Sequence, residues 1–399
     1  MTIREVVYKI KKKRIMLKIC LVFKAFFASF ILLFLKKRYT DVWVLGTGDD
    51  RYENNIRTFD VYLRNHQKRV IWVVDKKNIK EIIWMNKETV SRGSFRNYII
   101  ALQAYCCAFS HGDWDVAPGL FRIIKKRRAT LLYLEHAPSG IKREPANMHS
   151  NIPVDIQCCL SEYEKTLKLT EGAKIDKMVV TGFAGYDDYV INKNRSPVKR
   201  ILIMPTWRPW DLNGEYDFTA TELFKTYSRV FNDQTLKDAL AKYKAKITFI
   251  LHPTAARYFN LSDNVFKSSI IDIDVIVGND GRMRDKIIES DALVTDYSTL
   301  CIDFMYMNKP ILLYWYDEVK YEANNGLVVN RSDFLNTVVD NHNRLIESLG
   351  KMLSNPDALD IPPISKKYFD FYDNKNCERI FETVVETKSN ILGKKDGDK

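Results

Sequence analysis

Residues 292–303 read Ala-Leu-Val-Thr-Asp-Tyr-Ser-Thr-Leu-Cys-Ile-Asp, and this stretch decides the fold class. The apolar run from Ala292 to Thr295 is typical of a buried strand and ends directly at Asp296. Ser298 or Thr299 then caps a helix that we expect to continue to about Met307. A strand that passes through a short loop into a helix is the building unit of a doubly wound α/β sheet.

The same alternation of strand and helix patterns begins at residue 41 and fills most of the chain. Short apolar runs separated by helical stretches favour a parallel sheet that helices cover on both faces. The predicted strands are 42–45, 69–74, 104–110, 130–134, 155–160 and 177–181 in the first half, and 199–204, 246–251, 274–277, 292–295 and 310–314 in the second. Two longer helices are predicted near 333–353 and 374–391.

A polar segment with a proline, residues 192–199, interrupts this pattern and marks the predicted domain boundary. We therefore expect two doubly wound, Rossmann-like α/β domains, residues 39–192 and residues 199–350. Residues 351–399 are expected to form helices that pack back across the domains. Two such domains place a ligand cleft between the carboxyl ends of their strands.

The charge of the chain is concentrated at its amino terminus. The net charge is +12, and residues 1–38 account for +10 of it, which leaves a body of nearly balanced charge. A nucleic-acid-binding protein usually carries its basic residues on the folded surface. The distribution therefore argues against nucleic acid as a partner.

Residues 15–35 are apolar apart from Lys18 and Lys24, and the basic sequence Lys36-Lys-Arg38 follows them. The lysines interrupt a run just long enough to span a membrane, and the sequence after it does not resemble a signal-peptide cleavage site. We predict that residues 1–38 form a basic amphipathic segment that lies on an anionic membrane surface. A spanning helix, or a helix packed on its own domain or a partner, remains an alternative.

The cysteines do not have metal-ligand spacing. Of the seven, two adjacent pairs, Cys106-Cys107 and Cys158-Cys159, lie in strand-like runs, so buried free thiols in a reducing cytosol are expected. We predict no metal site on the protein. A divalent cation such as Mg²⁺ could still accompany a phosphorylated substrate.

Two further strands of the second half end in polar residues. Residues 201–208 (Ile-Leu-Ile-Met-Pro-Thr-Trp-Arg) deliver a Trp-Arg pair, and residues 247–253 (Ile-Thr-Phe-Ile-Leu-His-Pro) deliver His252. An ordinary helix cap at Ser298 or a structural histidine at 252 is the simpler interpretation of each motif alone. Together at one sheet edge, they indicate an anion site, because helix N-termini and hydroxyl groups bind phosphate.

These motifs, in this order, resemble the CDP-glycerol glycerophosphotransferase family, which includes bacterial teichoic-acid primases and polymerases and related capsule polymerases. The resemblance rests on Pro-Thr-Trp-Arg208, the His252-Pro strand, Thr295-Asp-Tyr-Ser-Thr299, and Lys309-Pro-Ile-Leu-Leu-Tyr314 followed by Tyr316-Asp317. It covers roughly residues 15–385. It implies a GT-B arrangement, in which two Rossmann-like domains face each other across a cleft.

The first half departs from the family pattern in two places. Where the family has Trp-His-Gly-Thr-Pro-Leu-Lys, this chain has Leu134-Glu-His-Ala-Pro-Ser-Gly-Ile-Lys142, so the family histidine corresponds to His136 and the lysine is one residue further away. Where the family has Gly-x-Pro-Arg-x-Asp, residues 182–187 lack the arginine. The sequence of the second half of the chain is therefore closer to the family pattern than that of the first half.

The resemblance implies a role for each of these residues. It makes the N-terminal domain the acceptor domain and the C-terminal domain the nucleotide-donor domain. The implied site residues are His136 and His252 for catalysis; Ser298, Thr299, Asp296 and Arg208 for the donor diphosphate; Thr206, Trp207, Tyr316 and Asp317 for the nucleotide; and Lys142, Asp187 and His111 for the acceptor.

The implied reaction moves an alditol phosphate, foremost glycerol phosphate, from a CDP-linked donor to a hydroxyl of a lipid-linked or glycan acceptor and releases CMP. It would take place at the cytoplasmic face of a bacterial membrane, in teichoic-acid or capsule synthesis. Two alternatives stay open: a GT-B glycosyltransferase that uses a nucleotide sugar, and a non-catalytic relative that binds nucleotide or glycan. The alditol, the acceptor, the oligomeric state and the choice between primase and polymerase are not specified by the sequence.

Overall fold

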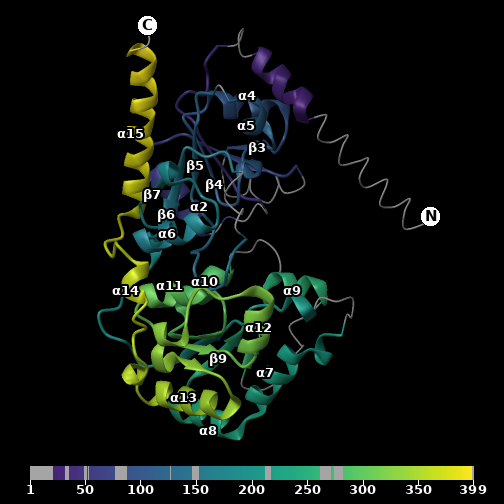
Figure 1. Cartoon of the computed structure of the whole chain (residues 1–399), viewed down its shortest axis with the longest axis vertical. Helices are drawn as coiled ribbons and strands as arrows, with labels where there is room; N and C mark the ends of the chain where they lie inside the picture. Colours follow the sequence, from purple (N-terminus) through teal and green to yellow (C-terminus); the bar gives the residue numbers. More distant parts are fainter. Residues whose placement is uncertain are drawn as a thin grey trace, which may run out of the picture.

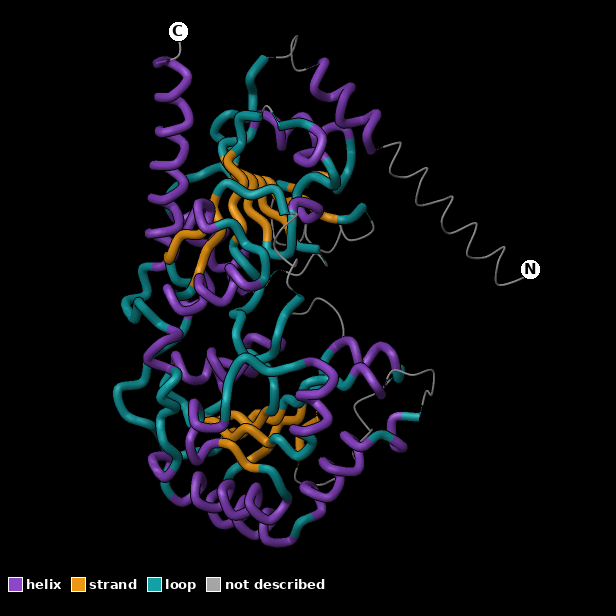
Figure 2. Tube along the Cα trace, in the orientation of Figure 1, coloured by secondary structure: helices purple, strands orange, loops and turns teal. Residues whose placement is uncertain are grey.

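Two parallel sheets, one from each half of the chain, organise the computed structural model, one in each of two lobes (Figures 1 and 2). The structure describes residues 21–31, 36–48, 52, 54–76, 88–125, 127–145, 152–211, 217–260, 271–273 and 282–397. All strand pairs given for both sheets are parallel. This confirms the predicted α/β class.

The N-terminal sheet has seven strands in the order β3-β2-β1-β4-β5-β6-β7. Its strands are β1 (Trp43–Gly46), β2 (Val70–Val74), β3 (Thr89–Ser91), β4 (Cys106–Phe109), β5 (Thr130–Tyr133), β6 (Ile156–Cys159) and β7 (Met178–Val180). The described helices around it include α2 (Asn54–Asn65), α4 (Phe95–Gln103), α5 (Leu120–Ile123) and α6 (Glu162–Thr170). The central strands are buried along their length, which explains their continuous apolar sequences.

The C-terminal sheet has six strands in the order β10-β9-β8-β11-β12-β13. Its strands are β8 (Arg200–Ile203), β9 (Lys246–Phe249), β10 (Ile271–Ile273), β11 (Ala292–Thr295), β12 (Ile311–Tyr314) and β13 (Val338–Val339). The described helices of this lobe include α7 (Glu222–Asn232), α8 (Gln234–Tyr243), α9 (Pro253–Tyr258), α10 (Arg282–Glu289), α11 (Leu300–Tyr306), α12 (Glu318–Asn325) and α13 (His342–Ser354).

Three strand or helix predictions need comment. The predicted strand 274–277 lies outside the described residues, and β10 comes just before it. The edge strand β3 was not predicted, because a short Thr-Val-Ser sequence carries little apolar pattern. The helix predicted over 333–353 is wrong in its first part: Val338 and Val339 pair with β12, and α13 begins only after Asn341, whose side chain accepts a hydrogen bond from the Arg344 N–H.

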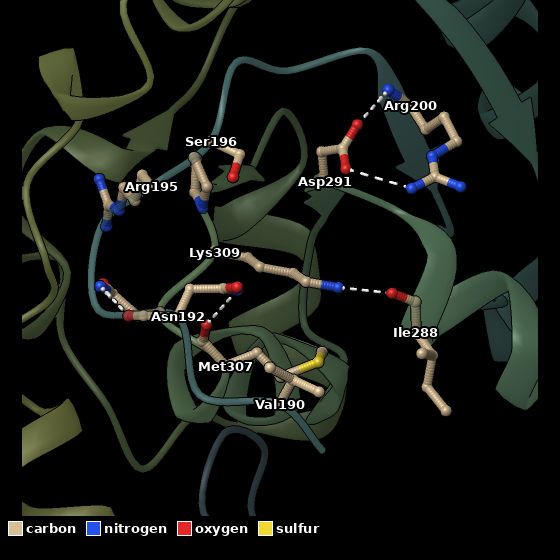
Figure 3. A pocket seen from close by; sticks show the side chains of 11 residues that line it. Val190, Asn192, Arg195, Ser196, Arg200, Ile288, Asp291, Met307 and Lys309 are labelled. Atoms are coloured by element: carbon tan, nitrogen blue, oxygen red, sulfur yellow. Dashed lines mark hydrogen bonds and ion pairs between the residues drawn. The ribbon is translucent and has the colours of Figure 1, made fainter. Parts of the chain in front are cut away.

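The linker between the lobes lines a pocket of 220 Å³ (Figure 3). The pocket lies at the amino ends of β8, β11 and β12, where Asp291 pairs with Arg200 and Lys309 donates to the Ile288 carbonyl at 2.7 Å. Arg195 donates to the carbonyls of Pro356 and Leu359. These groups fix the linker, at the sheet edge opposite to the one that binds ligands in such folds.

The C-terminal helix α15 (Asn376–Gly397) returns to the N-terminal lobe and runs along it (Figure 1, yellow). Phe381 stacks on Trp43 with ring centroids 5.6 Å apart, and the Lys388 ammonium donates to the Tyr105 carbonyl at 2.9 Å. Asp187 accepts hydrogen bonds from the N–H groups of Asn376 and Cys377 at the start of the helix. The last helix therefore connects the end of the chain to the first domain.

Residues 21–31 form a helix that packs one face on the N-terminal lobe. Ala25 and Ala28 are fully buried, and the Lys24 ammonium donates to the Gly93 carbonyl at 3.3 Å. The opposite face exposes aromatic side chains: Phe23, Phe26, Phe27 and Phe30. Within the described part of the chain, no helix has both the length and the hydropathy that a membrane span requires.

The described cysteines are all free and buried, as predicted. Burial raises the pKa of the Cys107 thiol to about 12. These thiols therefore act as small core residues.

Candidate active site

A cavity of 310 Å³ lies between the two lobes, and its lining comes from both. The C-terminal lobe contributes the residues that follow β8, β9 and β11, which are Thr206, Trp207, His252, Ser298 and Thr299. The N-terminal lobe contributes His136 and Lys142, which follow β5. The structure thus brings both predicted catalytic histidines, the predicted hydroxyl pair and the predicted acceptor lysine into one cleft.

His136 is held at the cleft by an unusual backbone turn. Glu135, which precedes it, has a φ of 63°, a left-handed conformation that costs a residue with a side chain roughly 1–2 kcal/mol. Asn55 stabilises this turn, because its amide group donates to the carbonyls of Leu134 and Glu135 at 3.1 and 2.9 Å. The Asn55 side-chain oxygen also accepts from the Gly185 N–H at 2.9 Å. The turn is therefore fixed from two sides.

A buried charge network lies beneath this turn. The Lys168 ammonium, which is fully buried, lies 3.2 Å from carboxylate oxygens of both Glu135 and Glu164. Burial alone would lower the pKa of Lys168, but the two carboxylates raise it overall. Glu164 also accepts from the Ser139 N–H at 2.8 Å. The network thus ties the segment on both sides of His136 to α6.

His136 is suited to accept a proton. Its side chain is open to the cleft, but the surrounding protein removes part of its water, and this desolvation lowers its pKa. The charge of His111 lowers the pKa further, since the two imidazole rings stack with centroids 4.8 Å apart. A histidine with a pKa below its usual range is neutral at pH 7 and can act as a general base.

The hydroxyl pair precedes a short helix. The sequence predicts a helix capped by Ser298 or Thr299. In the structure Thr299 is the cap residue of α11, and its side chain makes no capping hydrogen bond. The Ser298 hydroxyl accepts from the Leu300 N–H at 3.2 Å. Both hydroxyl side chains line the cleft and can donate to an anion there.

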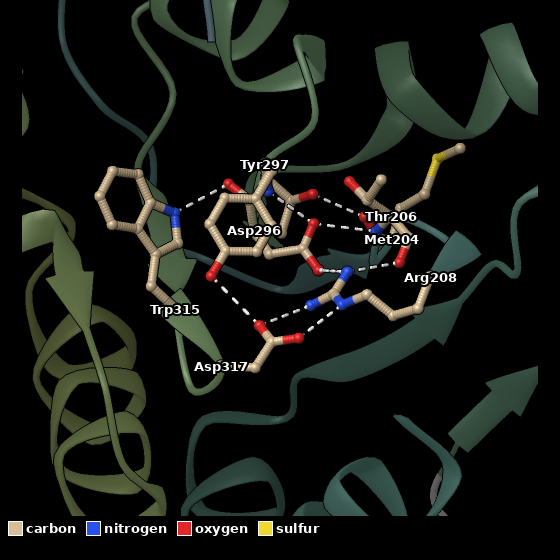
Figure 4. A network of polar contacts seen from close by, with 8 residues as sticks. Met204, Thr206, Arg208, Asp296, Tyr297, Trp315 and Asp317 are labelled. Atoms are coloured by element: carbon tan, nitrogen blue, oxygen red, sulfur yellow. Dashed lines mark hydrogen bonds and ion pairs between the residues drawn. The ribbon is translucent and has the colours of Figure 1, made fainter. Parts of the chain in front are cut away.

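Arg208 is not among the residues that line the cavity, and its predicted contact with the donor diphosphate stays a prediction. The residue is 2% exposed, and its guanidinium donates to Asp317 at 2.7 and 3.0 Å, to Asp296 at 2.9 Å and to the Thr206 carbonyl at 2.7 Å (Figure 4). The guanidinium also lies over the ring of Tyr297. All its nitrogens are therefore engaged within the lobe.

The same network holds three other predicted site residues, whose ligand contacts stay predictions. Asp296 is fully buried and accepts from the Thr206 N–H at 2.9 Å, and Asp317 is 8% exposed. The ring of Tyr316 lies against the Arg208 guanidinium, whose central carbon is 5.4 Å from the ring centroid. None of the three lines the cleft. They instead fix the loops that carry Thr206, Trp207 and Ser298, a role that strand-end motifs alone do not distinguish from ligand contact.

Two predicted acceptor residues also lie outside this cavity. Asp187 accepts hydrogen bonds at the start of α15, as described above, and its assignment to the acceptor stays a prediction. His111 lines a neighbouring crevice and reaches the cleft only through its stacking on His136.

Three cleft residues were missed at the level of sequence. Asn55 supports the His136 turn, and Arg284 is 2% exposed and donates to Asp188 of the other lobe at 2.7 Å. Asp303 accepts from the Tyr189 hydroxyl at 2.8 Å, and burial raises its pKa to about 6. Arg284 and Asp303 lie within helical patterns, where nothing in the sequence distinguishes them from surface charges.

The described residues contain no cluster of three or more side chains suited to hold a metal ion. The polar side chains that line the cleft include hydroxyls, imidazoles, an ammonium and a guanidinium, which are suited to a phosphorylated ligand, beside the Asn55 amide and the Asp303 carboxylate.

The fold and the cleft define a two-domain α/β protein of the GT-B type, with histidines and hydroxyl side chains of the two domains lining one cavity. Residues 174–386 match the family model described as CDP-Glycerol:Poly(glycerophosphate) glycerophosphotransferase. Because the match covers more than half of the chain, the protein belongs to this family.

Relatives and solved structures agree with this membership. The minor teichoic acid biosynthesis protein GgaB of Bacillus subtilis is 24% identical over 375 residues, which are 88% of this chain and 40% of that protein. The teichoic acid glycerol-phosphate primase of Bacillus subtilis is 46% identical over 134 residues, 33% of this chain and 29% of that protein. The chain thus spans less than half the length of these two relatives.

The structure of the wall teichoic acid polymerase TagF superposes with a TM-score of 0.68 at 17% identity and covers 97% of this chain and 99% of that one. A putative UDP-N-acetylglucosamine 2-epimerase from Listeria monocytogenes reaches a TM-score of 0.51 at 12% identity, covering 86% of this chain and 95% of the other. At these identities the likeness shows the fold.

Proposed function

We propose that the protein transfers an alditol phosphate, foremost glycerol phosphate, from a CDP-linked donor to a hydroxyl of a lipid-linked or glycan acceptor. One observation carries this proposal. A single cavity is lined by His136 of the first domain, whose pKa is lowered, and by His252, Ser298 and Thr299 of the second. Family membership supports the donor class, and a TagF variant has been solved after soaking with CDPG.

In this mechanism His136 removes the proton from the acceptor hydroxyl. The hydroxyl oxygen forms a bond to the β-phosphorus of the donor, the bond from that phosphorus to the bridging oxygen breaks, and CMP leaves. Ser298, Thr299 and His252 bind and orient the phosphoryl oxygens, while Trp207 packs beside the nucleotide. Most of the rate enhancement then comes from positioning and from stabilising negative charge.

A donor panel tests the proposal. Purified protein is incubated with CDP-glycerol, CDP-ribitol and UDP-N-acetylglucosamine, and its thermal stability is recorded, because a bound ligand raises the melting temperature. We expect stabilisation by a CDP-alditol and release of CMP when acceptor is added, with a product heavier by one alditol phosphate. Stabilisation by the nucleotide sugar alone, with a product that gains a sugar and no phosphate, would favour the glycosyltransferase alternative.

We also propose that the protein sits on the cytoplasmic face of the cell membrane through its N-terminal segment. The helix at residues 21–31 supports this, since it buries its alanines and presents Phe23, Phe26 and Phe30, which are 72%, 58% and 58% exposed. Aromatic side chains on an exposed helix face are suited to the headgroup boundary of a bilayer.

The helix also packs on the domain, so a truncation would disturb the fold, and substitutions on the exposed face are the sharper test. The triple variant Phe23→Ser, Phe26→Ser, Phe30→Ser should lose sedimentation with phosphatidylglycerol vesicles. A matched triple variant at other exposed apolar residues, Ile175→Ser, Val319→Ser and Ile361→Ser, should sediment like the wild type. Equal sedimentation of the two triple variants would remove the helix from this role.

A further inference from the structure

A second crevice of 440 Å³ lies at the carboxyl ends of β1 and β4, beside the proposed active site. Its lining includes Gly48, His111, Asp113, Trp114 and Arg122. The strand order of the N-terminal sheet reverses between β1 and β4, so the crevice lies at the topological switch point of this domain. Doubly wound sheets bind their ligands at such points.

The floor of the crevice is rigid. The Asp115 carboxylate accepts from the N–H groups of Ser110 and His111 at 3.1 and 2.8 Å, which fixes the turn after β4. A Cβ atom at Gly46 would collide with the Asp115 carbonyl, so the turn packs directly on β1. Trp114 lies on this fixed turn, and half of its surface is exposed. The backbone that carries the indole is thus fixed before any ligand arrives.

The charges that line the crevice are largely compensated by one another. Arg122 donates to Asp113 through two nitrogens, at 3.3 and 3.2 Å. Asp115 lies 3.6 Å from the His111 ring nitrogen. Among the described lining residues, Arg122 is the one guanidinium, and a carboxylate already holds it. A chain of phosphate groups requires cationic partners, so this lining favours a neutral ligand.

A stacked pair of imidazoles lies between the crevice and the cleft that contains the proposed base. The imidazole of His111 lines the crevice, that of His136 lines the cleft, and the two rings stack with an interplanar angle of 16°. A ligand in the crevice that contacts His111 is therefore one imidazole ring away from the proposed base.

We infer that this crevice binds a neutral sugar ring of the acceptor, stacked on the Trp114 indole, with the attacking hydroxyl directed toward His136. A pyranose has a flat apolar face of C–H bonds and a rim of hydroxyls, which match an exposed indole beside compensated polar groups. The assignment rests on the proposed function and narrows it: the acceptor ends in a sugar, in preference to a growing alditol-phosphate chain.

Saturation-transfer NMR on the full chain tests the assignment without donor or turnover. The probes are methyl N-acetyl-β-D-glucosaminide and synthetic tri(glycerol phosphate). The wild type should transfer saturation to the ring C–H groups of the glycoside, and Trp114→Ala should weaken its binding about tenfold, as expected for loss of a central aromatic contact. Trp114→Phe should retain part of the binding. The control Ile175→Ala, at an exposed residue elsewhere in the domain, should bind like the wild type.

The melting temperature of Trp114→Ala separates lost binding from lost folding and should stay near that of the wild type, because the indole is half exposed. Glycoside binding that survives Trp114→Ala, or a Trp114-dependent signal from tri(glycerol phosphate) in its place, would overturn the inference. If no CDP-alditol binds while the Trp114-dependent glycoside signal persists, the proposed donor fails and the crevice assignment stands.

Discussion

The ammonium of Lys168 lies 3.2 Å from the carboxylate of Glu135, directly behind the left-handed turn that presents His136 to the cleft. The pair is buried, and a second carboxylate, that of Glu164 on α6, lies 3.2 Å from the same ammonium. A buried ion network of this kind contributes little net stability, but losing one partner leaves a buried charge uncompensated. Its effect here is to fix the backbone on both sides of the proposed base.

Lys168→Met should therefore destabilise the protein and reduce turnover together. Leaving Glu135 and Glu164 without their cation should cost about 3–5 kcal/mol of unfolding free energy, a fall of roughly 10 °C in melting temperature. The matched control is Lys165→Met, three residues earlier on α6, where the ammonium is partly exposed and pairs with Glu162. Equal melting temperatures for the two variants would show that the network does not hold the turn.

Arg208 and Ser298 should separate stability from donor binding. Arg208→Lys cannot reproduce the contacts to Asp296 and Asp317, so we expect a loss of about 3–5 kcal/mol in unfolding free energy. Arg200→Lys, at an exposed pair, should be nearly neutral in its effect on unfolding free energy. Weakened CDP-glycerol binding in a fully stable Arg208→Lys protein would instead support Arg208 as a donor-site residue.

Ser298→Ala should leave the melting temperature unchanged while it weakens CDP-glycerol binding several-fold, as calorimetry would measure.

The pH dependence of turnover should report the His111–His136 stack. His136 must be neutral to accept a proton, so the rate should fall as the pH drops through its lowered pKa. The charge of His111 contributes to that lowering, after desolvation. His111→Asn should therefore raise the pKa of His136 and move the acid limb of the kcat profile to higher pH. His66→Asn, at a distant exposed histidine, should leave the profile in place; an acid limb that moves to lower pH in His111→Asn contradicts the assignment.

Asp303 should contribute more to the stability of the protein in mild acid than at neutral pH. Burial raises its folded-state pKa from 3.8 to about 6, so the neutral form is favoured by folding. Its stabilising contribution is complete below the unfolded-state pKa and is lost as the pH rises through about 6. Asp303→Asn removes this dependence. The melting temperature of the variant should therefore rise relative to that of the wild type as the pH is raised from 4 to 7. A constant difference between the two proteins over that range would disprove the linkage.

The sequence predicted the fold and the strand-end residues of the cleft because both follow from local pattern. Continuous apolar runs indicated the buried parallel strands, and His252 and Ser298 follow two of them directly. The pattern did not reveal which polar residues face inward: Arg208 and Thr206 share one loop, yet the first is buried and the second lines the cleft. Arg284 was missed because its contact with Asp188 joins helices from different lobes, which no local pattern encodes.

The central claim is that His136 is the base that activates the acceptor while the second domain binds the donor independently. The most direct measurement compares CDP-glycerol affinity, by calorimetry, with CMP release in the presence of acceptor, for the wild type and His136→Gln. The account predicts that affinity stays within about twofold while turnover falls by about 10²–10⁴. Unchanged turnover, or a loss of turnover that follows entirely from lost donor affinity, would contradict it.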